Sequence, residues 1–596
     1  MAKYIIQDST LSSIADAIRQ QTGKDSSEKL SPAQMVNEIQ NTLGDFPGLV
    51  DRTLTDIKHS GVETIAPYAF YHYSTLKTVE FPNCTTVGTS AFVSCTGLTS
   101  ISLPNCSNPP SNAFTGCTNI QNATLGVLSL LGTSSTTNFP LNVAKANITD
   151  INLPQCSSIG IYTFKGYTKL QTISAPVCTA VMGQAFASCT NLTNVYLPEC
   201  TLIGNTTAFK GCTTISNVTL GLSELTSTNL PLTVASSTLT EVHFPNCVAI
   251  DASYSTTLEV DRAFVTYKGS SNSGGITTYI YSQKYPKLHI IDLPVCTSIY
   301  VDTFVGYTNL ESINLPVCTY IGDYAFSGCT GLSFVNLSVC TYIGTEAFYR
   351  CSSLTSVSAP VCTYIESYAF SSCAALQNVT LGLSELTSTN TPFTPISSTL
   401  TTVNLPNCTL VDTSAFKSYS SLTSINLPVC TAINNDGLRS CYSLTSVNLP
   451  VCSYIGMDAF NSCTSLTSIS LPACQTLRPD AFAGCASLTS INLPICDAIQ
   501  ERVFARCINL TFVNAPACRY IDKAAFYSCR NLTTIILDNS SIVGLWYSNA
   551  FVNTPITDSS YTGSFGSIYV PASLVSAYKV ANNWSDIADR ITAIVE

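Results

Sequence analysis

Charged residues are scarce in this sequence. Lys, Arg, Asp and Glu together make up 10% of the 596 residues, whereas roughly 25% is usual in soluble proteins. The formal net charge is −10, and no cluster of Lys and Arg is long enough to follow a phosphate backbone. Nucleic-acid binding therefore lacks its electrostatic basis, and we expect no nucleic-acid partner.

Histidine is almost absent as well, with only four residues. They are scattered as His59, His72, His243 and His289. The sequence also contains no convincing Ser/His/acid arrangement, glycine-rich phosphate loop or pair of carboxylates. We therefore expect no enzyme, no catalytic residue and no cofactor.

Long apolar runs are missing too. No uninterrupted run reaches the ~18 residues that a membrane-spanning helix needs, and the opening MAKYIIQDST does not resemble a signal peptide. These features disfavour membrane insertion and classical secretion, so we expect the chain to fold in a reducing cytoplasm.

Cysteine is abundant, and its spacing indicates a repeat. Many of the 28 cysteines follow one another at intervals of eleven, as at 84, 95, 106 and 117. The segment from Leu98 to Cys106, LTSISLPNC, fits the template L-x-x-L-x-L-x-x-N/C of a leucine-rich repeat. The other half of each 22-residue unit follows the pattern I-G-x-x-A-F-x-x-C, and its recurring Phe, replaced once by Leu438, marks eighteen units from Phe70 to Phe551.

Tyrosine replaces the second cysteine in several units, and a covalent partner could not be replaced in this way. The replacements lie three residues after the Phe, at Tyr73, Tyr167, Tyr267, Tyr307 and Tyr419. We therefore predict free cysteines, stacked as small buried residues with weakly hydrogen-bonding thiols. No cysteines lie two to four residues apart, which argues against a metal site.

The repeat resembles the BspA-like class of leucine-rich repeats from about Leu54 to Phe565. The resemblance implies a right-handed solenoid with a parallel sheet on one face, and adhesion rather than catalysis. We expect an α/β fold, an elongated solenoid of about eighteen turns. Its expected parts are a helical attachment or capping module at 1–48, the solenoid at 49–566 with an irregular insertion at about 248–287, and a cap at 567–596.

Two short amphipathic helices are expected in the N-terminal module. Their apolar stripes must pack on each other, on the first repeat or on a partner, and we expect them to be buried against a virion protein or in a homo-oligomeric bundle. The expected attachment or oligomerisation residues are Leu11, Ile14, Ile18, Val36 and Ile39. The segment resembles modules that open tail and virion-surface proteins of bacteriophages, and an ordinary solenoid cap is the alternative.

The unit after Cys247 is the irregular one. Its Gly/Ser-rich stretch is flanked by Tyr267, Tyr279, Tyr281 and Tyr285, which predicts a projecting hairpin. Because loops that interrupt a regular scaffold often carry recognition, we place receptor contacts among these four tyrosines.

The outward positions of the repeating strands are mostly Ser, Thr and Asn. Such a face can serve ladder hydrogen bonding and solubility, or it can be a polar shelf for glycans. Some outward positions depart from this pattern, namely Glu80, Tyr196, His243, Asp292, Phe334 and Phe512. Of these we add His243, Asp292, Tyr196 and Phe334 to the expected receptor contacts. A row with Tyr320, Tyr342 and Tyr364, repeated at Tyr454 and Tyr520, either stacks sugars or stacks on itself.

The C-terminal segment should close the solenoid. We expect a last strand at 568–570 and a helix opened by Pro571. Its apolar face would contain Leu574, Val575, Tyr578, Trp584, Ile587 and Ile591. A cap is required because an open end would expose core and strand edges.

The sequence therefore predicts a virion-attached adhesin, a bacteriophage tail fibre or receptor-binding protein. Its partners would be a virion or baseplate protein at the N-terminal helices and a host surface glycan or protein at the solenoid. It would reside on the virion surface after assembly in the host cytoplasm. The alternative is a bacterial cell-surface adhesin of the same repeat class.

Overall fold

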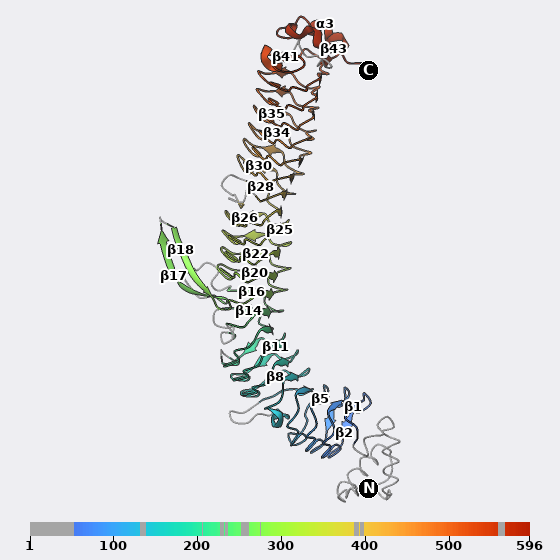
Figure 1. Cartoon of the computed structure of the whole chain (residues 1–596), viewed down its shortest axis with the longest axis vertical. Coiled ribbons are helices and arrows are strands. Elements are labelled where there is room, and N and C mark those ends of the chain that lie inside the picture. The colour runs from blue at the N-terminus through green and yellow to red at the C-terminus, as the bar shows by residue number, and fades with distance from the viewer. Residues whose placement is uncertain are drawn as a thin grey trace, which may run out of the picture. The chain divides into compact units, whose positions relative to one another are not determined.

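A computed structural model shows parallel strands stacked turn upon turn (Figure 1). It describes residues 53–131, 139–204, 207–226, 232, 237–251, 262–273, 276–386, 392–393, 399–557 and 567–595. The expected attachment residues Leu11, Ile14, Ile18, Val36 and Ile39 lie outside these ranges, as does the whole 1–48 module. The described chain forms two compact units. Unit 1 takes in residues up to 251, 262–266 and 283–295, and unit 2 takes in 267–282 and everything from 296 onward.

Unit 1 contains one main parallel sheet, built from the first half of each repeat. Its strands, in pairing order, are β1 (Asp56–Lys58), β3 (Thr78–Glu80), β5 (Ser100–Leu103), β6 (Asn122–Leu125), β7 (Asp150–Asn152), β9 (Thr172–Ser174), β11 (Asn194–Leu197), β13 (Asn217–Leu220), β15 (Glu241–His243) and β19 (Ile290–Asp292). The second half of each repeat forms smaller parallel groups. These are β2 (Thr64–Ile65) with β4 (Thr86–Val87), β8 (Ser158–Ile159) with β10 (Ala180–Val181) and β12 (Leu202–Ile203), and β14 (Glu224–Leu225) with β16 (Ala249–Ile250); a 3-10 turn, η1, covers Asn142–Ala144.

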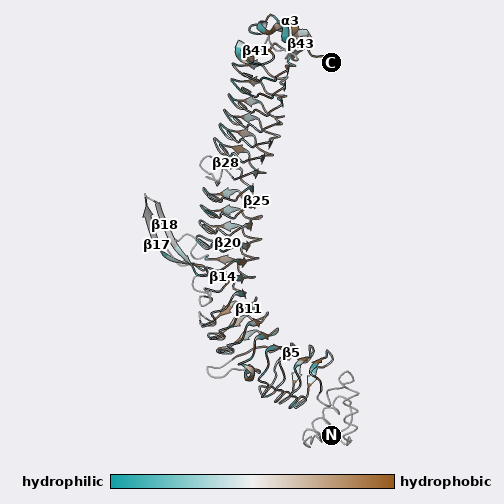
Figure 2. Ribbon diagram, in the orientation of Figure 1, coloured by the Kyte–Doolittle hydropathy of each residue, from teal (hydrophilic) through white to brown (hydrophobic). Residues whose placement is uncertain are grey.

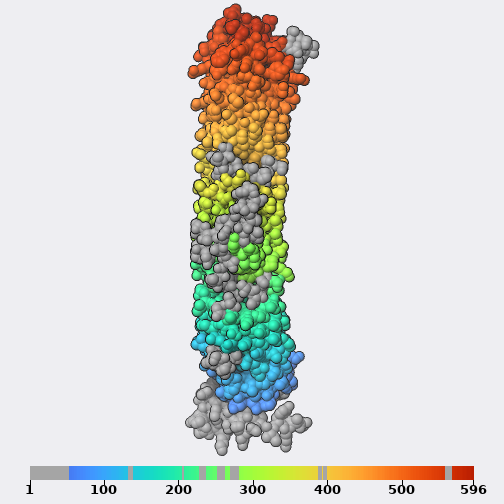
Figure 3. All heavy atoms as spheres, turned by 90° about the vertical axis from the view of Figure 1, so that its left-hand side faces the viewer, coloured from blue at the N-terminus to red at the C-terminus, as the bar shows by residue number. Residues whose placement is uncertain are grey.

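Unit 2 repeats this arrangement. Its main strands pair in parallel in two runs. They are β21 (Ser312–Asn314), β23 (Phe334–Asn336), β25 (Ser356–Ala359), β27 (Asn378–Leu381), β29 (Thr402–Asn404), β31 (Ser424–Asn426) and β33 (Ser446–Asn448), followed by β36 (Ser490–Asn492), β38 (Phe512–Asn514), β40 (Thr534–Ile536), β42 (Ser567–Val570) and β43 (Ile591–Ala593). Figure 3 shows the yellow, orange and red turns of this unit following one another in chain order.

The second-half strands of unit 2 are two residues long and also parallel. The first run contains β20 (Ser298–Ile299), β22 (Tyr320–Ile321), β24 (Tyr342–Ile343) and β26 (Tyr364–Ile365); the second contains β28 (Glu385–Leu386), β30 (Leu410–Val411), β32 (Ala432–Ile433), β34 (Tyr454–Ile455), β35 (Thr476–Leu477), β37 (Ala498–Ile499), β39 (Tyr520–Ile521) and β41 (Gly544–Leu545). Most of these short strands have one buried residue beside a more exposed one, as in β22 and β24. Figure 2 accordingly shows both brown and teal ribbon within the stacked turns.

The interior of each turn is filled by the repeat positions that the sequence singled out. In the turn around Phe348, the buried residues are Ile343, Ala347, Phe348, Cys351 and Leu354. Phe348 stacks between Phe326 and Phe370, with ring centroids 5.2 and 5.4 Å away. Its amide N–H donates to Ala369 of the next turn at 2.8 Å, so backbone bonds and ring stacking both join successive turns.

All 28 cysteines are free and buried, which confirms the prediction of free thiols. They form two sets with different acceptors. The Cys351 thiol donates to the Phe326 carbonyl one turn earlier, at 3.2 Å, whereas Cys340 donates to the Tyr342 carbonyl within its own turn, also at 3.2 Å. The Phe326 carbonyl also accepts the Cys329 amide at 3.1 Å, so the Cys351 thiol adds a second donor to it, and both thiols find acceptors in the interior.

The C-terminal segment differs in part from the expectation. Strand β42 lies where a last strand was expected, but β43 pairs with it further on, so β42 is not the last. Only short helical turns lie between them: η5 (Ala572–Leu574), α3 (Val575–Tyr578) and η6 (Ser585–Arg590), with η4 (Ser548–Phe551) before β42. Tyr578 and Trp584 are buried and bond to Val543, the phenol accepting from its amide and the indole donating to its carbonyl.

Candidate functional site

The outward face of the main sheet in unit 1 carries an unusual row of side chains. Strand register places Tyr196 beside Thr219, Thr219 beside His243, and His243 beside Asp292. Glu241 lies two residues before His243 on the same face of β15, because side chains alternate along a strand. We call these five residues the sheet patch.

Within the sheet patch, one imidazole is flanked by two carboxylates. His243 Nδ1 lies 3.3 Å from Asp292 Oδ2, and Nε2 lies 4.0 Å from Glu241 Oε2. These three side chains are only about one-third exposed, at 36%, 34% and 38%, whereas Tyr196 is 48% exposed. The group therefore offers an aromatic ring, an imidazole and two acceptors, which suits directional binding of a polar partner.

The structure thus brings together three of the residues that the sequence had singled out, Tyr196, His243 and Asp292. Their separation in sequence is large, and only the strand register shows that they are neighbours. Sequence reasoning missed Glu241. The signal was available, because Glu241 occupies the outward position that is Ser or Thr in most other units.

Elsewhere on the outward faces, neutral side chains bond to one another. Asn426 donates to Asn404, and Asn448 donates to Asn426, both at 2.7 Å. In unit 1, Asn217 donates to Asn194 at 3.1 Å. These bonds support the interpretation of the polar face as a hydrogen-bond ladder. Charged groups also occur at the first strands, where Lys58 pairs with Glu80 at 2.8 Å, but the sheet patch combines carboxylates with an imidazole and an exposed tyrosine.

The insertion forms a hairpin, as expected, from β17 (Val265–Ser273) and β18 (Ile276–Gln283). Figure 1 shows it projecting away from the stacked turns of unit 2. The rings of Tyr267 and Tyr281 meet edge to face at 5.7 Å, and the Tyr281 hydroxyl donates to Asp302 at 2.8 Å. The Tyr279 side chain lies outside the described residues.

Tyr285 is not available as a receptor contact, and its assignment to the recognition loop was wrong. It is fully buried and packs edge to face against Phe264 at 6.0 Å. Tyr307 packs against Phe304 in the same way, at 6.1 Å. Tyr285 therefore fills the repeat position that the sequence predicted for Tyr267. The hairpin is an insertion between Phe264 and Tyr285.

A buried carboxylate lies at the base of this insertion. Both Asp251 oxygens accept the Ala263 amide at 3.0 Å. Burial raises the pKa of Asp251 to about 6, although the Ala263 amide and the charges of Arg262 and Lys284 oppose that shift. Because Asp251 and Ala263 are both fully buried, this contact fixes the base of the insertion rather than binding a ligand.

The tyrosine row stacks on itself in unit 2. Tyr342 lies between Tyr320 and Tyr364, with centroids 4.8 and 5.4 Å away and rings within 10° of parallel. Both faces of Tyr342 are covered, so the middle of the row cannot stack a sugar. Phe334, the remaining expected contact, is 54% exposed on the main sheet of unit 2.

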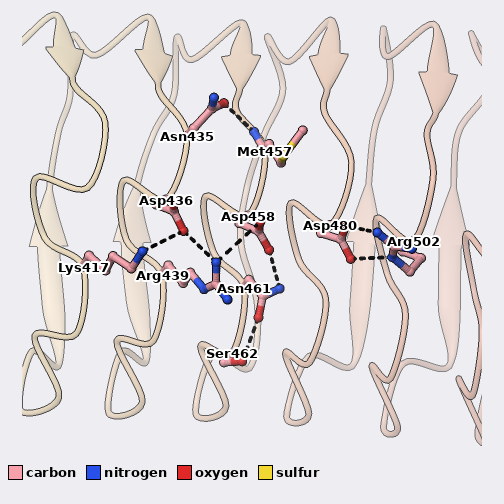
Figure 4. Close-up of polar contacts among 10 residues, drawn as sticks. All are labelled: Lys417, Asn435, Asp436, Arg439, Met457, Asp458, Asn461, Ser462, Asp480 and Arg502. Carbon is pink, nitrogen blue, oxygen red and sulfur yellow. Dashed lines mark hydrogen bonds and ion pairs between the residues drawn. The ribbon is translucent and has the colours of Figure 1, made fainter.

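A second polar cluster in unit 2 consists of ion pairs within and between turns. Figure 4 shows Asp436 between Lys417 and Arg439, and Arg439 reaching on to Asp458. Further along, Arg502 makes two bonds of 2.9 Å to Asp480. The positive and negative groups lie close to one another, so this ladder is better suited to holding turns in register than to attracting a charged partner.

Among the residues that the structure describes, no three His, Cys, Asp or Glu side chains are grouped so as to hold a metal ion. No helix in the described part of the chain combines the length and apolar character needed to cross a membrane.

These features define a leucine-rich repeat solenoid with a localised patch on its sheet. The family described as "BspA type Leucine rich repeat region" matches the chain in six copies, at residues 51–143, 142–254, 275–394, 341–467, 393–511 and 453–572. The chain therefore belongs to the BspA-type leucine-rich repeat family. Proteins of this family are typically surface proteins, and the family describes a repeat rather than a catalytic domain.

Solved structures of leucine-rich repeat proteins are similar to this chain at low identity. A leucine-rich repeat protein from Bacteroides ovatus is 20% identical over 65% of this chain and 86% of its own, with a TM-score of 0.29. A leucine rich cell surface protein from Faecalibacterium prausnitzii is 17% identical over 70% of this chain and 90% of its own, with a TM-score of 0.21. No curated protein matches the chain.

Proposed function

We propose that this protein is an adhesin that binds a surface partner through the sheet patch. The supporting observation is that Tyr196, His243 and Asp292 lie close together on the outward face, at positions filled by Ser, Thr or Asn in most other turns. Exposed aromatic residues beside partly buried hydrogen-bonding groups are typical of binding hot spots. The partner is a host surface glycan or protein.

We further propose that the adhesin is attached to a virion. The N-terminal segment resembles bacteriophage tail and virion-surface modules, and its apolar stripes would dock onto a virion or baseplate protein. A bacterial cell-surface adhesin is the alternative, and membership of the BspA-type family is fully compatible with it. Antibodies against the solenoid would decide between them by labelling either virions or bacterial cells in electron micrographs.

Binding measurements with single substitutions test the sheet patch. Tyr196→Ala and Asp292→Ala, made in the full chain, should each weaken binding to host cells at least about tenfold, as loss of a hot-spot residue does. Ser174→Ala is the matched control, since Ser174 lies beside Tyr196 in the same row. If all three variants bind host cells as tightly as the parent protein, the sheet patch is not part of the recognition site.

Truncations test where attachment and recognition lie. Deleting residues 1–45 should abolish incorporation into particles while the remaining solenoid still binds host cells. Trimming residues 268–284 would then weaken adsorption without affecting assembly if the hairpin contributes contacts through Tyr281. Normal adsorption after this trimming would leave recognition to the sheet patch alone.

A further inference from the structure

We propose a second binding site in unit 2, at which Trp546 and Tyr520 form an aromatic platform for a neutral pyranose ring. Trp546 stacks on Tyr520 with ring centroids 4.0 Å apart and an interplanar angle of 1°. These residues belong to neither the sheet patch nor the hairpin, so the site is additional to the proposed adhesin surface.

Local backbone geometry holds the indole in place. Strand β41 pairs with β39 so that Gly544 lies beside Tyr520, at the position of the tyrosine row. A Cβ at Gly544 would lie 3.2 Å from Trp546 Nε1, closer than side chains normally approach. Trp546 also donates its backbone N–H to Ile521 at 3.1 Å. Glycine thus leaves room for an indole that takes the place of the next ring in the row.

The platform has one covered face and one open face. Trp546 is 55% exposed and the adjacent Tyr547 is 49% exposed, although one face of the indole rests on Tyr520. Within the described chain, β41 ends its sheet, and the C-terminal cap covers its backbone through the bond from Asn583 to the Leu545 carbonyl at 2.7 Å. The cap therefore closes the strand edge and leaves the indole exposed.

The contrast with the other tryptophan supports a binding role. Trp584 is 1% exposed and donates to Val543, so it serves the core. Tyr342, inside the stacked row, has neighbours on both faces. Of these three ring systems, only Trp546 combines a fixed orientation with a free face, and burying that face against a ligand removes a large apolar area from water.

The charges around the platform favour a neutral ligand. The carboxylates of Asp497 and Asp522 are close enough to Tyr520 to raise the pKa of its phenol, after the larger effect of burial, and the Arg478 guanidinium opposes them. Lys523 lies near Tyr547 and pairs with Glu501 at 2.9 Å. Mixed charges do not select a cation over an anion, but they offer acceptors and donors to sugar hydroxyls. The C–H face of a pyranose would then lie on the indole.

Tryptophan fluorescence of the full chain provides the test, because acrylamide reaches exposed Trp546 but not buried Trp584. The probes are maltohexaose, cellohexaose and a galactan oligosaccharide, with tetramethylammonium chloride as the cationic comparison. We expect at least one of the oligosaccharides to reduce acrylamide quenching about twofold with a saturable dependence on concentration. Isothermal titration of that sugar should show at least a tenfold loss of affinity in Trp546→Ala.

Tyr442→Ala and Trp546→Phe are the control variants. Tyr442→Ala removes a similarly exposed ring, 49% exposed, and should leave sugar affinity unchanged. Trp546→Phe retains an aromatic face and should recover part of the affinity if Trp546→Ala disturbs the fold. The proposal is overturned if no oligosaccharide protects Trp546, if only tetramethylammonium does, or if Trp546→Ala binds as tightly as the parent. Loss of cell binding in Asp292→Ala with sugar binding intact would separate this site from the sheet patch.

Discussion

At the scale of single residues, each turn depends on a few positions that are buried and in contact with both neighbouring turns. Phe348 is the clearest case, because its ring stacks on the turns before and after it and its N–H donates to the next. Cys351 adds a bond from its thiol to the preceding turn. Substitutions at such positions act across three turns at once.

Phe348→Ala should lower the free energy of unfolding of its region by about 3 to 5 kcal/mol, since it removes a fully buried ring and leaves a cavity. Guanidinium denaturation followed by circular dichroism measures this loss, and the transition should split into stages. Val361→Ala is the control, because Val361 is 47% exposed and its truncation should change stability by less than about 0.5 kcal/mol. Equal melts for both variants would contradict the packing scheme.

Asp251 predicts a dependence of stability on pH. Its pKa is about 6 in the folded chain against an ordinary value of 3.8, so the folded state holds the proton more tightly. Asp251 therefore makes its full contribution to the free energy of unfolding below about pH 4. That contribution falls as the pH rises through about 6, and the total loss is up to about 3 kcal/mol. Asp251→Asn cannot ionise and should lack this loss. Urea denaturation of the parent protein and of Asp251→Asn at pH 4 and pH 7 tests the expectation. If the two proteins differ in free energy of unfolding by the same amount at both pH values, the expectation is refuted.

At the scale of elements, the hairpin shows how the repeat accepts an insertion. Phe264 and Tyr285 still pack against each other although β17 and β18 lie between them in the chain. The Lys284 N–H donates to Phe264 at 2.8 Å, which closes the base of the insertion. The repeat is thereby continued in unit 1 by Leu288 and β19, and the register that forms the sheet patch is preserved.

The ion-pair ladder is the second feature at this scale. A double-mutant cycle with Asp480→Asn and Arg502→Gln should give a coupling energy of about 0.5 to 1 kcal/mol, because the pair is bidentate but partly exposed. The coupling should fall as salt is raised from 0.05 to 0.5 M, as expected for a screened pair. A coupling that is independent of salt would show that packing, rather than charge, joins these two turns.

At the scale of the whole molecule, the described chain contains turns that bury thiols throughout both units. Burial raises the pKa of Cys318 and Cys441 to about 12, so these two thiols stay protonated at neutral pH, and the burial of all 28 cysteines keeps reagents from reaching them. Because each turn contacts mainly its neighbours, stability is distributed along the stack, and regions can open separately.

The burial of the thiols predicts how the protein reacts with iodoacetamide. The native protein should remain almost unmodified at pH 8 without reductant, whereas the unfolded chain in guanidinium should gain 28 adducts, one for each free cysteine. Intact mass spectrometry counts the adducts. Intermediate denaturant should give partial counts that correspond to opened groups of turns. Failure of the unfolded chain to react would indicate disulfides and overturn the assignment of free thiols.

The sequence by itself determined the repeat, the buried positions, the free thiols and the hairpin, because these follow from local periodicity and spacing. It also singled out Tyr196, His243 and Asp292 as departures from the pattern. Only the tertiary structure decided that they are neighbours, since strand register joins residues separated by an insertion. It also decided between two tyrosines: Tyr267 has the right spacing from Phe264, but Tyr285 fills the core, because packing selects the residue that reaches the interior regardless of its distance along the chain. The stacking of Trp546 on Tyr520 likewise depends on the space that Gly544 leaves between two turns, and spacing in the sequence does not specify it.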